Sequence, residues 1–170
     1  LEGPVSLIDP LYRARRMSTM RAMVLREHGG PEVLHEEDVP LPEPGPGEVR
    51  VNVCAVSLNH LDLWVRRGGP AFKLAYPHRL GSDVAGTVDA VGPGVTDLAP
   101  GQKGGVQPGL SCGRCRACLG GHDNLCRDYR ILGENAQGGY AERLVVPRVN
   151  IAPFPGTLGF AEAAASILPF

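Results

Sequence analysis

The sequence has no surplus of basic side chains: 17 Lys and Arg stand against 18 Asp and Glu, for a formal net charge of −1. A protein that grips nucleic acid through its phosphates usually carries a basic surplus or a basic patch. Arg13, Arg15 and Arg16 form the one dense basic run, and a solvated tail accounts for it. We therefore expect no nucleic-acid partner.

The sequence also lacks an apolar run near the roughly 20 residues that a helix needs to cross a bilayer. The first twenty residues, LEGPVSLIDPLYRARRMSTM, lack the basic-then-apolar order of a secretory signal peptide. We expect a cytoplasmic protein with no membrane partner. Because Met17 and Met20 come just before the first strand-like segment, we treat residues 1–19 as a flexible N-terminal extension outside the fold.

The composition favours many short strands joined by tight turns, because 23 Gly and 16 Pro are many for a helical protein. Alternation of apolar and polar residues is clearest at 48–56, where Val49 and Val51 face one side and Arg50 the other. Gly104 and Gly105 weaken one further candidate strand. In full, the pattern predicts strands at residues 21–26, 33–39, 48–56, 84–91, 104–107 and 140–146.

Two segments predict helices. The first begins after Asn59, which is a good N-cap residue, and places Asp62 near the third helical position. The second, at 161–170, is an apolar helix start, and we expect its continuation to lie in a further domain.

The stretch CGRCRACLGGHDNLC packs four of the five cysteines into 15 residues, at the spacing C-x2-C-x2-C-x7-C. Four thiolates at such spacings can close a tetrahedral zinc site, and a closed site stabilises a fold without catalysing a reaction. The metal ligands that we predict are Cys112, Cys115, Cys118 and Cys126. His122 lies inside this loop and is interpreted as an exposed bystander.

Two other uses of these cysteines are weaker. A ferredoxin run would place the fourth cysteine three residues after the third and follow it with proline, whereas here it comes after seven and precedes Arg127. Disulfides would need an oxidising compartment, which nothing in the sequence supports. A four-cysteine zinc site alone would also be compatible with a non-enzymatic binding module.

Further segments follow in a recognisable order: HGGPEVLHEEDVPLPEPGPGEVRVNVCAVSLNHLDLWVRRG, LGSDVAGTVDAVGPGV, the four cysteines, and GGYAERLVVP. Together they resemble the catalytic, GroES-like domain of the medium-chain dehydrogenase/reductase superfamily, which holds the zinc-type alcohol dehydrogenases and the quinone reductases. The resemblance covers about residues 20–170. It implies a mainly β, distorted-barrel domain over 20–160 with short helices and a structural zinc loop at 109–130.

The family adds an α/β Rossmann domain that binds NAD(P), and this domain is absent from the chain. No G-x-G-x-x-G follows a strand in the 170 residues. We expect the chain alone to be inactive, and the full-length protein to be a homo-oligomer that uses NAD(P).

The resemblance also locates the active site, where this sequence departs from the alcohol dehydrogenases. Those enzymes typically hold a catalytic zinc with a cysteine in a CHTD-like segment and a histidine in a GHE-like segment. Here the matching positions hold Asn59 and Ser82, which are poor zinc ligands. The NHLD segment resembles the zinc-independent quinone reductases, so the implied enzyme transfers hydride from NAD(P)H to a carbonyl or quinone, or from an alcohol, with no catalytic zinc.

By this resemblance, Asn59 and Asp62 are catalytic residues at the substrate end of the cleft, and His60 approaches the phosphates of the cofactor. Alternatively, Asn59 and Asp62 simply cap and start a helix, and His60 has a surface role. A conventional zinc alcohol dehydrogenase, in which Asp62 or Asp83 recruits the metal, also stays open.

Five other side chains are given structural roles. Trp64 lies at helical spacing from Leu61 and is predicted in the core, and Cys54 is interpreted as an inert small hydrophobe. Ser82 and Asp83 could do no more than satisfy backbone groups. Tyr140 is interpreted as an aromatic residue at the start of a strand.

Overall fold

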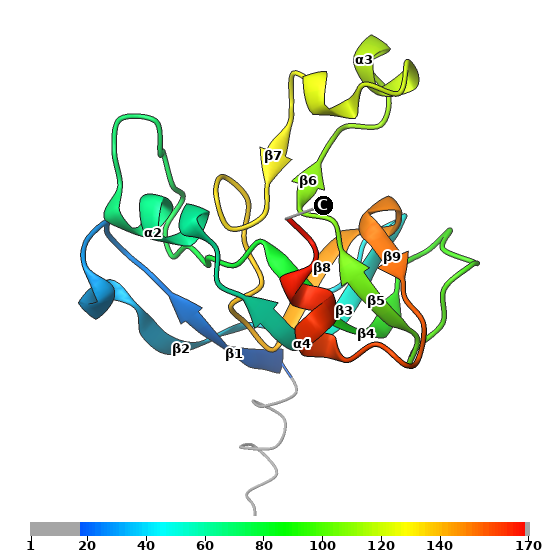
Figure 1. Cartoon of the computed structure of the whole chain (residues 1–170), viewed down its shortest axis with the longest axis horizontal. Coiled ribbons are helices and arrows are strands. Elements are labelled where there is room, and N and C mark those ends of the chain that lie inside the picture. The colour runs from blue at the N-terminus through cyan, green and yellow to red at the C-terminus, as the bar shows by residue number, and fades with distance from the viewer. Residues whose placement is uncertain (1–17, 169–170) are drawn as a thin grey trace, which may run out of the picture.

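Short strands dominate the computed structural model, which describes residues 18–168 (Figure 1). Most of the expected N-terminal extension, residues 1–17, lies outside the described residues, as do residues 169–170. The strands are β1 (Thr19–Val24), β2 (His35–Pro40), β3 (Glu48–Ser57), β4 (Asp83–Val91), β5 (Lys103–Val106), β6 (Gly109–Leu110), β7 (Arg130–Ile131), β8 (Arg143–Pro147) and β9 (Ile151–Pro153). The helices are α2 (His60–Arg67), α3 (Arg116–Leu119) and α4 (Phe160–Ala165), with 3-10 turns η1 (Pro31–Val33), η2 (Asp123–Leu125) and η3 (Arg148–Asn150).

A five-stranded antiparallel sheet, in the order β8-β3-β4-β5-β9, carries the main core. Val49 and Val51 of β3 are buried, while Arg50 between them is only partly covered, so the alternation predicted for this strand is confirmed. Two shifts of register against β4, at Arg50/Val51 and Val53/Ala55, are β-bulges that bend the strand. The all-antiparallel pairing and the short strands confirm the mainly β fold.

Helix α4 packs on this sheet through small side chains, with Ala163 and Ala164 against Ala85 of β4. The two glycines predicted to weaken β5 lie within the strand. A Cβ atom at Gly105 would stand 2.9 Å from Cδ1 of Ile167, just beyond α4. The absence of a side chain at Gly105 leaves room for Ile167, although the end of this flexible side chain could shift to make way for a Cβ atom.

Two smaller units flank the main sheet. The β1–β2 ribbon begins at Thr19, one residue before the boundary predicted from the sequence, and a second core of Leu25, Val33, Val65 and Leu80 joins its end to helix α2. The β6–β7 ribbon carries α3 and η2 on a lobe that projects from the rest of the molecule (Figure 1). No described helix has the length and apolar character that crossing a bilayer requires.

The prediction that Trp64 lies in the core is wrong. Its side chain on α2 is 54% exposed, whereas Val65 next to it is fully buried. Spacing relative to Leu61 places Trp64 on a neighbouring turn of the helix but does not decide which face the core covers. Cys54 is also exposed, at the register shift of β3 between Val53 and Ala55, so it does not serve as a packed hydrophobe.

Candidate active site and metal centre

The four predicted metal ligands come together on the projecting lobe. Their sulfur atoms all lie within 4.8 Å of one another, with Sγ–Sγ distances of 3.5 Å between Cys115 and Cys118 and 3.9 Å between Cys112 and Cys118. Tetrahedral zinc with Zn–S bonds of about 2.3 Å needs sulfurs roughly 3.8 Å apart. The backbone N–H of Cys112 donates to Sγ of Cys126 at 3.4 Å, as outer-shell donors do around metal thiolates. The donor set and its spacing fit one zinc ion.

The local backbone explains how the loop closes. Cys115 caps the N-terminus of the short helix α3, and Cys126 follows directly on η2. Gly113 and Gly121 have φ values of 67° and 76°, a left-handed conformation that glycine adopts without strain. His122 is exposed on this loop, which agrees with its interpretation as a bystander.

The thiols differ in their readiness to ionise. Hydrogen bonds from the backbone N–H groups of Arg114 and Cys115 lower the pKa of Cys112 to about 6. Burial raises the pKa of Cys118 to about 11. A divalent cation deprotonates a thiol that coordinates it, so a bound zinc would convert all four cysteines to thiolates.

The predicted active-site residues lie elsewhere, at the start of α2. Asn59 caps the helix, and the structure shows a capping box: Oδ1 of Asn59 accepts from the backbone N–H of Leu61 at 3.3 Å, and the backbone N–H of Asn59 donates to Oδ2 of Asp62 at 2.8 Å. The predicted cap is confirmed. Oδ1 of Asp62 accepts from the backbone N–H of Gly81 at 2.9 Å, which ties α2 to the segment entering β4.

The sequence did not predict that Asp83 would contact Asn59. The side-chain amide of Asn59 donates from Nδ2 to Oδ2 of Asp83 at 3.1 Å. Asp83 is 2% exposed, and its Oδ1 atom is buried with no hydrogen-bond partner among the described residues. Burial raises the pKa of Asp83, and the nearby Asp62 carboxylate raises it further. The Asn59 bond and a backbone hydrogen bond from Leu168 oppose that rise.

Two neighbours complete this cluster. Ser82 donates from Oγ to the backbone carbonyl of Leu132 at 2.7 Å, so the expectation that it satisfies a backbone group is confirmed. The ring of Tyr140 lies against Gly81, and its hydroxyl is buried with no hydrogen-bond partner among the described residues. Burial raises the pKa of Tyr140 far above its ordinary value, and the Asp62 carboxylate raises it further.

His60 lies at the first turn of α2 and is exposed. Its ring packs at a tilt against that of Trp64, with 5.0 Å between centroids and 44° between ring planes. The two rings form an exposed pair beside Asn59, and Leu58 on the other side of Asn59 is also exposed.

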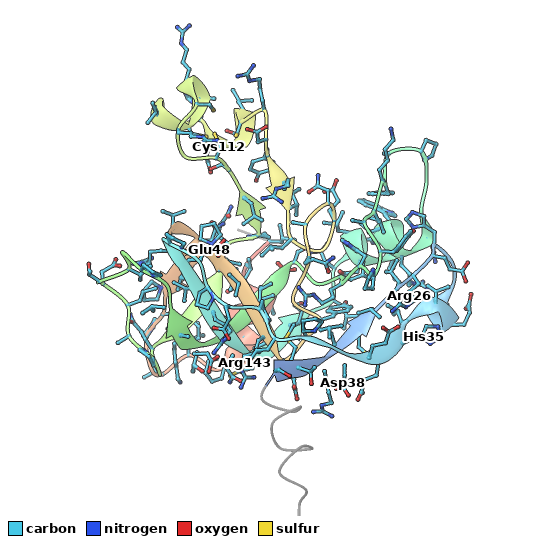
Figure 2. All side chains as sticks on the ribbon, turned by 180° about the vertical axis from the view of Figure 1, so that it is seen from behind. Arg26, His35, Asp38, Glu48, Cys112 and Arg143 are labelled. Atoms are coloured by element: carbon cyan, nitrogen blue, oxygen red, sulfur yellow. The ribbon has the colours of Figure 1, made fainter. Side chains whose placement is uncertain are left out.

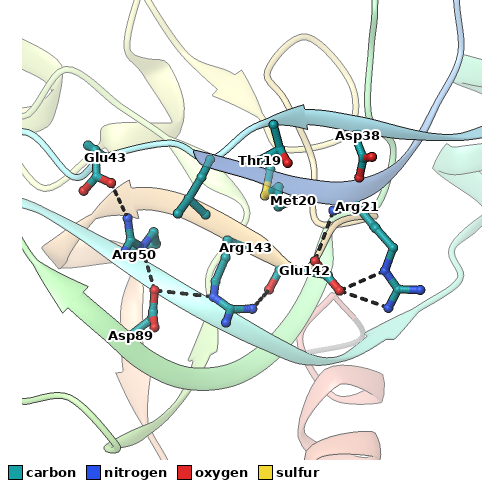
Figure 3. Close-up of a pocket in the computed structure, with 10 residues that line it drawn as sticks. Thr19, Met20, Arg21, Asp38, Glu43, Arg50, Asp89, Glu142 and Arg143 are labelled. Carbon is teal, nitrogen blue, oxygen red and sulfur yellow. Dashed lines mark hydrogen bonds and ion pairs between the residues drawn. The ribbon is translucent and has the colours of Figure 1, made fainter. Parts of the chain in front are cut away.

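A cavity of about 640 Å³ lies on another part of the surface, between β1 and the outer face of β3, β4 and β8 (Figure 3). Most of its charges are paired: Asp89 lies between Arg50 and Arg143, at 2.6 and 3.4 Å, and Arg21 pairs with Glu142. None of the residues predicted for the active site lines it. Figure 2 places Cys112 on the lobe, well apart from Arg143 and Asp38 beside this cavity.

The geometry can be compared with known proteins. Residues 45–156, well over half of the chain, match the family described as the alcohol dehydrogenase GroES-like domain. The chain belongs to this family. The four cysteines and the Asn59 cluster thus lie in a GroES-like domain of the medium-chain dehydrogenase/reductase superfamily.

Several dehydrogenases resemble this GroES-like domain. L-galactonate-5-dehydrogenase of Escherichia coli (strain K12) is 32% identical over 154 residues, which are 91% of this chain and 44% of that protein. The crystal structure of an NAD-dependent alcohol dehydrogenase is 59% identical with a TM-score of 0.84, covering 88% of this chain and 43% of that one. A cobalt- and zinc-bound thermostable alcohol dehydrogenase from Pyrobaculum aerophilum is 39% identical with a TM-score of 0.79, and the match covers 87% of this chain and 44% of that one. The chain therefore spans less than half of the length of these relatives.

Proposed function

We propose that the chain is the catalytic domain of an NAD(P)-dependent oxidoreductase of the alcohol dehydrogenase and quinone reductase type. In this proposal the four cysteines hold a structural zinc, and hydride transfer proceeds without a catalytic zinc. The remainder of the protein supplies the NAD(P)-binding domain. The likeness to an NAD-dependent alcohol dehydrogenase at 59% identity supports the oxidoreductase class.

The hydrogen bonding of Asn59 is the observation that carries the zinc-free part of the proposal. Its carboxamide is committed to a helix cap and to Asp83, and Ser82 is committed to a backbone carbonyl. Neither side chain is a thiolate or an imidazole, the ligands that zinc prefers. Among the described residues, the four cysteines are the one group of three or more side chains placed to hold a metal.

Asn59 would then act by hydrogen bonding. NAD(P)H, when bound, supplies the hydride to a carbonyl or quinone carbon. The partly exposed Asn59 has one N–H of its amide left, and this N–H can stabilise the oxygen on which negative charge develops. Asp62, predicted as catalytic, is 4% exposed with both oxygens engaged by backbone N–H groups, which supports a role in positioning Asn59.

His60 is proposed to contact the cofactor. It is exposed at the N-terminus of α2, where the helix dipole favours anions such as phosphates. We further propose a small carbonyl, quinone or alcohol as substrate, a cytoplasmic location, and a homo-oligomer for the full-length protein.

A conventional zinc alcohol dehydrogenase is the second candidate, because the relative from Pyrobaculum aerophilum binds cobalt and zinc. In that case Asp62 or Asp83 would recruit the catalytic metal. Both oxygens of Asp62 already accept hydrogen bonds, which argues against Asp62 as the ligand and leaves Asp83.

Counting metal in the full-length enzyme separates the two. One zinc per chain, with turnover of quinones, enones or alcohols that survives a chelator while thermal stability falls, supports the zinc-free site. Two zinc ions, with activity lost to the chelator before the melting temperature changes, would establish the second candidate. A full-length protein that turns over none of these substrates with NADH or NADPH would refute both.

A further inference from the structure

We propose that Asp83 is a positioning residue that holds the side-chain amide of Asn59 in one orientation, and so decides which of its atoms is presented to a substrate. This inference rests on the proposed function, because it takes Asn59 as the group that meets the substrate oxygen. The proposal adds a residue that acts through Asn59 and does not itself touch the substrate.

The oxygen of the Asn59 amide meets a hydrogen-bond donor, and its nitrogen meets an acceptor. Oδ1 accepts from the backbone N–H of Leu61 at 3.3 Å, and Nδ2 donates to Oδ2 of Asp83 at 3.1 Å. Rotating the amide by half a turn would place its oxygen against the Asp83 carboxyl and its NH₂ group against the N–H of Leu61. The contact with Leu61 would then set donor against donor whatever the charge of Asp83, and the contact with an ionised Asp83 would be repulsive as well. The observed orientation therefore satisfies both partners and the rotated one does not.

Leu61 alone would not fix the amide so firmly. At 3.3 Å its bond is long for an N–H···O contact, and an N-cap bond by itself is worth about 1 kcal/mol. The bond from Asn59 to Asp83 links the helix cap to a strand 24 positions further along the chain. Because the backbone N–H of Asn59 is also held by Asp62, the residue is constrained at three points.

This orientation leaves one useful group free. An asparagine amide has two N–H donors, and Asp83 takes one of them. The second N–H points away from Asp83, as the planar geometry of the amide requires. That N–H is the donor that the proposed mechanism needs, and in the rotated amide its place would be taken by a carbonyl oxygen, which repels an oxyanion.

The burial of Asp83 is costly, which argues that it has a purpose beyond filling space. It is 2% exposed, no Arg, Lys or His of the described residues forms an ion pair with it, and one of its oxygens has no hydrogen-bond partner there. An apolar side chain at this position would avoid the desolvation of a carboxyl group. The Asn59 contact survives protonation, because a proton on Oδ1 leaves Oδ2 free to accept.

A double-mutant cycle in the full-length enzyme tests the proposal. Asp83→Leu should lower kcat by roughly 10- to 100-fold, as loss of orientation does, and change KM little. Asp83→Asn keeps an acceptor oxygen and should recover most of the loss. In an Asn59→Ala background, Asp83→Leu should lower kcat no further. Losses that simply add, or a full kcat in Asp83→Leu, would overturn the proposal.

A second measurement does not depend on turnover or on an Asp83 variant that folds. With ¹⁵N-asparagine labelling, NMR should show the two Nδ2 protons of Asn59 well separated and slow to exchange, with the signal assigned by its absence in Asn59→Ala. Asn135, exposed on its loop, is the comparison. An Asn59 amide that exchanges as fast as Asn135 would refute the positioning role even in an active enzyme. If the Asn59 amide is restrained but the full-length protein shows no turnover, the positioning role stands and the proposed function is refuted.

Discussion

Oδ1 of Asp62 accepts a hydrogen bond from the backbone N–H of Gly81 at 2.9 Å, across 19 positions of the sequence. Its other oxygen accepts from the backbone N–H of Asn59 at the start of α2. One buried carboxylate therefore joins the helix start to the segment that enters β4. The same carboxylate lies beside the buried hydroxyl of Tyr140, so it also shapes the electrostatics of the cluster.

Replacing Asp62 should therefore cost stability. Asp62→Ala leaves the buried N–H of Gly81 without its partner and removes half of the capping box, for a loss of about 2–4 kcal/mol in the free energy of unfolding. Urea denaturation of the chain measures it. Asp97→Ala, which breaks an exposed ion pair with Arg148, is the control and should cost much less. Equal losses for the two variants would contradict this view of Asp62.

Much of the local structure could be predicted from the sequence. The alternation at Val49, Arg50 and Val51 depends on neighbours in the chain and indicates a strand without any tertiary information. The capping box depends on two residues three positions apart, Asn59 and Asp62, and was equally open to prediction. The cysteine spacing belongs to the same class, because all four ligands lie within 15 residues.

The contacts between distant segments could not be predicted in this way. The bonds from Asp62 to Gly81 and from Asn59 to Asp83 span 19 and 24 positions, and they exist only because the sheet brings the start of β4 beside α2. The exposure of Trp64 has the same origin. The helical period predicts which residues are neighbours on one helix. Only the packing of that helix in the fold determines that Val65 is buried and Trp64 is exposed to solvent.

The metal centre gives a direct prediction. The purified chain should be colourless and contain one zinc, and replacing any one of Cys112, Cys115, Cys118 or Cys126 with serine should release it, because each supplies one of four thiolates. Cys54→Ser is the matched control and should keep the metal, since Cys54 lies on β3. Metal analysis and the absorbance spectrum check both points. A brown protein containing iron would show that the cluster has been misassigned.

Removing the zinc should open the structure locally. Structural zinc in small domains contributes roughly 10–16 kcal/mol of apparent binding energy coupled to folding, but here the five-stranded sheet has its own core. Hydrogen exchange after chelation should therefore rise first over residues 109–130 and stay slow in β3 and β4. Loss of protection throughout β3 and β4 at the same rate would mean that the lobe and the sheet unfold as one unit.

Trp64 offers a spectroscopic check on the α2 surface. It is the single tryptophan of the chain and is 54% exposed, so its fluorescence should be red-shifted and readily quenched by acrylamide. Because its ring packs against that of His60, with 5.0 Å between centroids, His60→Ala should change the emission intensity, whereas His122→Ala on the zinc lobe should not. A blue-shifted emission that resists quenching would place the indole in the core after all.

His78 should make stability depend on pH. It is 2% exposed, its Nε2 lies 3.2 Å from the carbonyl oxygen of Gly133, and burial lowers its pKa below the ordinary value. Arg79 and His28 nearby lower it further, while the Gly133 bond opposes the shift. The folded state therefore keeps His78 neutral at a pH where the unfolded chain already binds a proton.

Because the unfolded state binds this proton more readily, the free energy of unfolding falls as the pH falls. Above the unfolded pKa of about 6.5 both states are neutral at this position, and the stability is complete. As the pH falls below that value, the unfolded state gains a proton first, so stability falls by at most about 1.4 kcal/mol per pH unit until the folded pKa is reached. His78→Gln keeps an N–H donor for Gly133 but cannot titrate, so its stability should fall less between pH 7 and pH 5. Urea denaturation of both proteins across this range measures the difference, in which the titrations of the other histidines cancel. Parallel curves for the two proteins would show that His78 titrates equally in the folded and unfolded states, and a wild type that loses less stability than His78→Gln would show that folding raises its pKa.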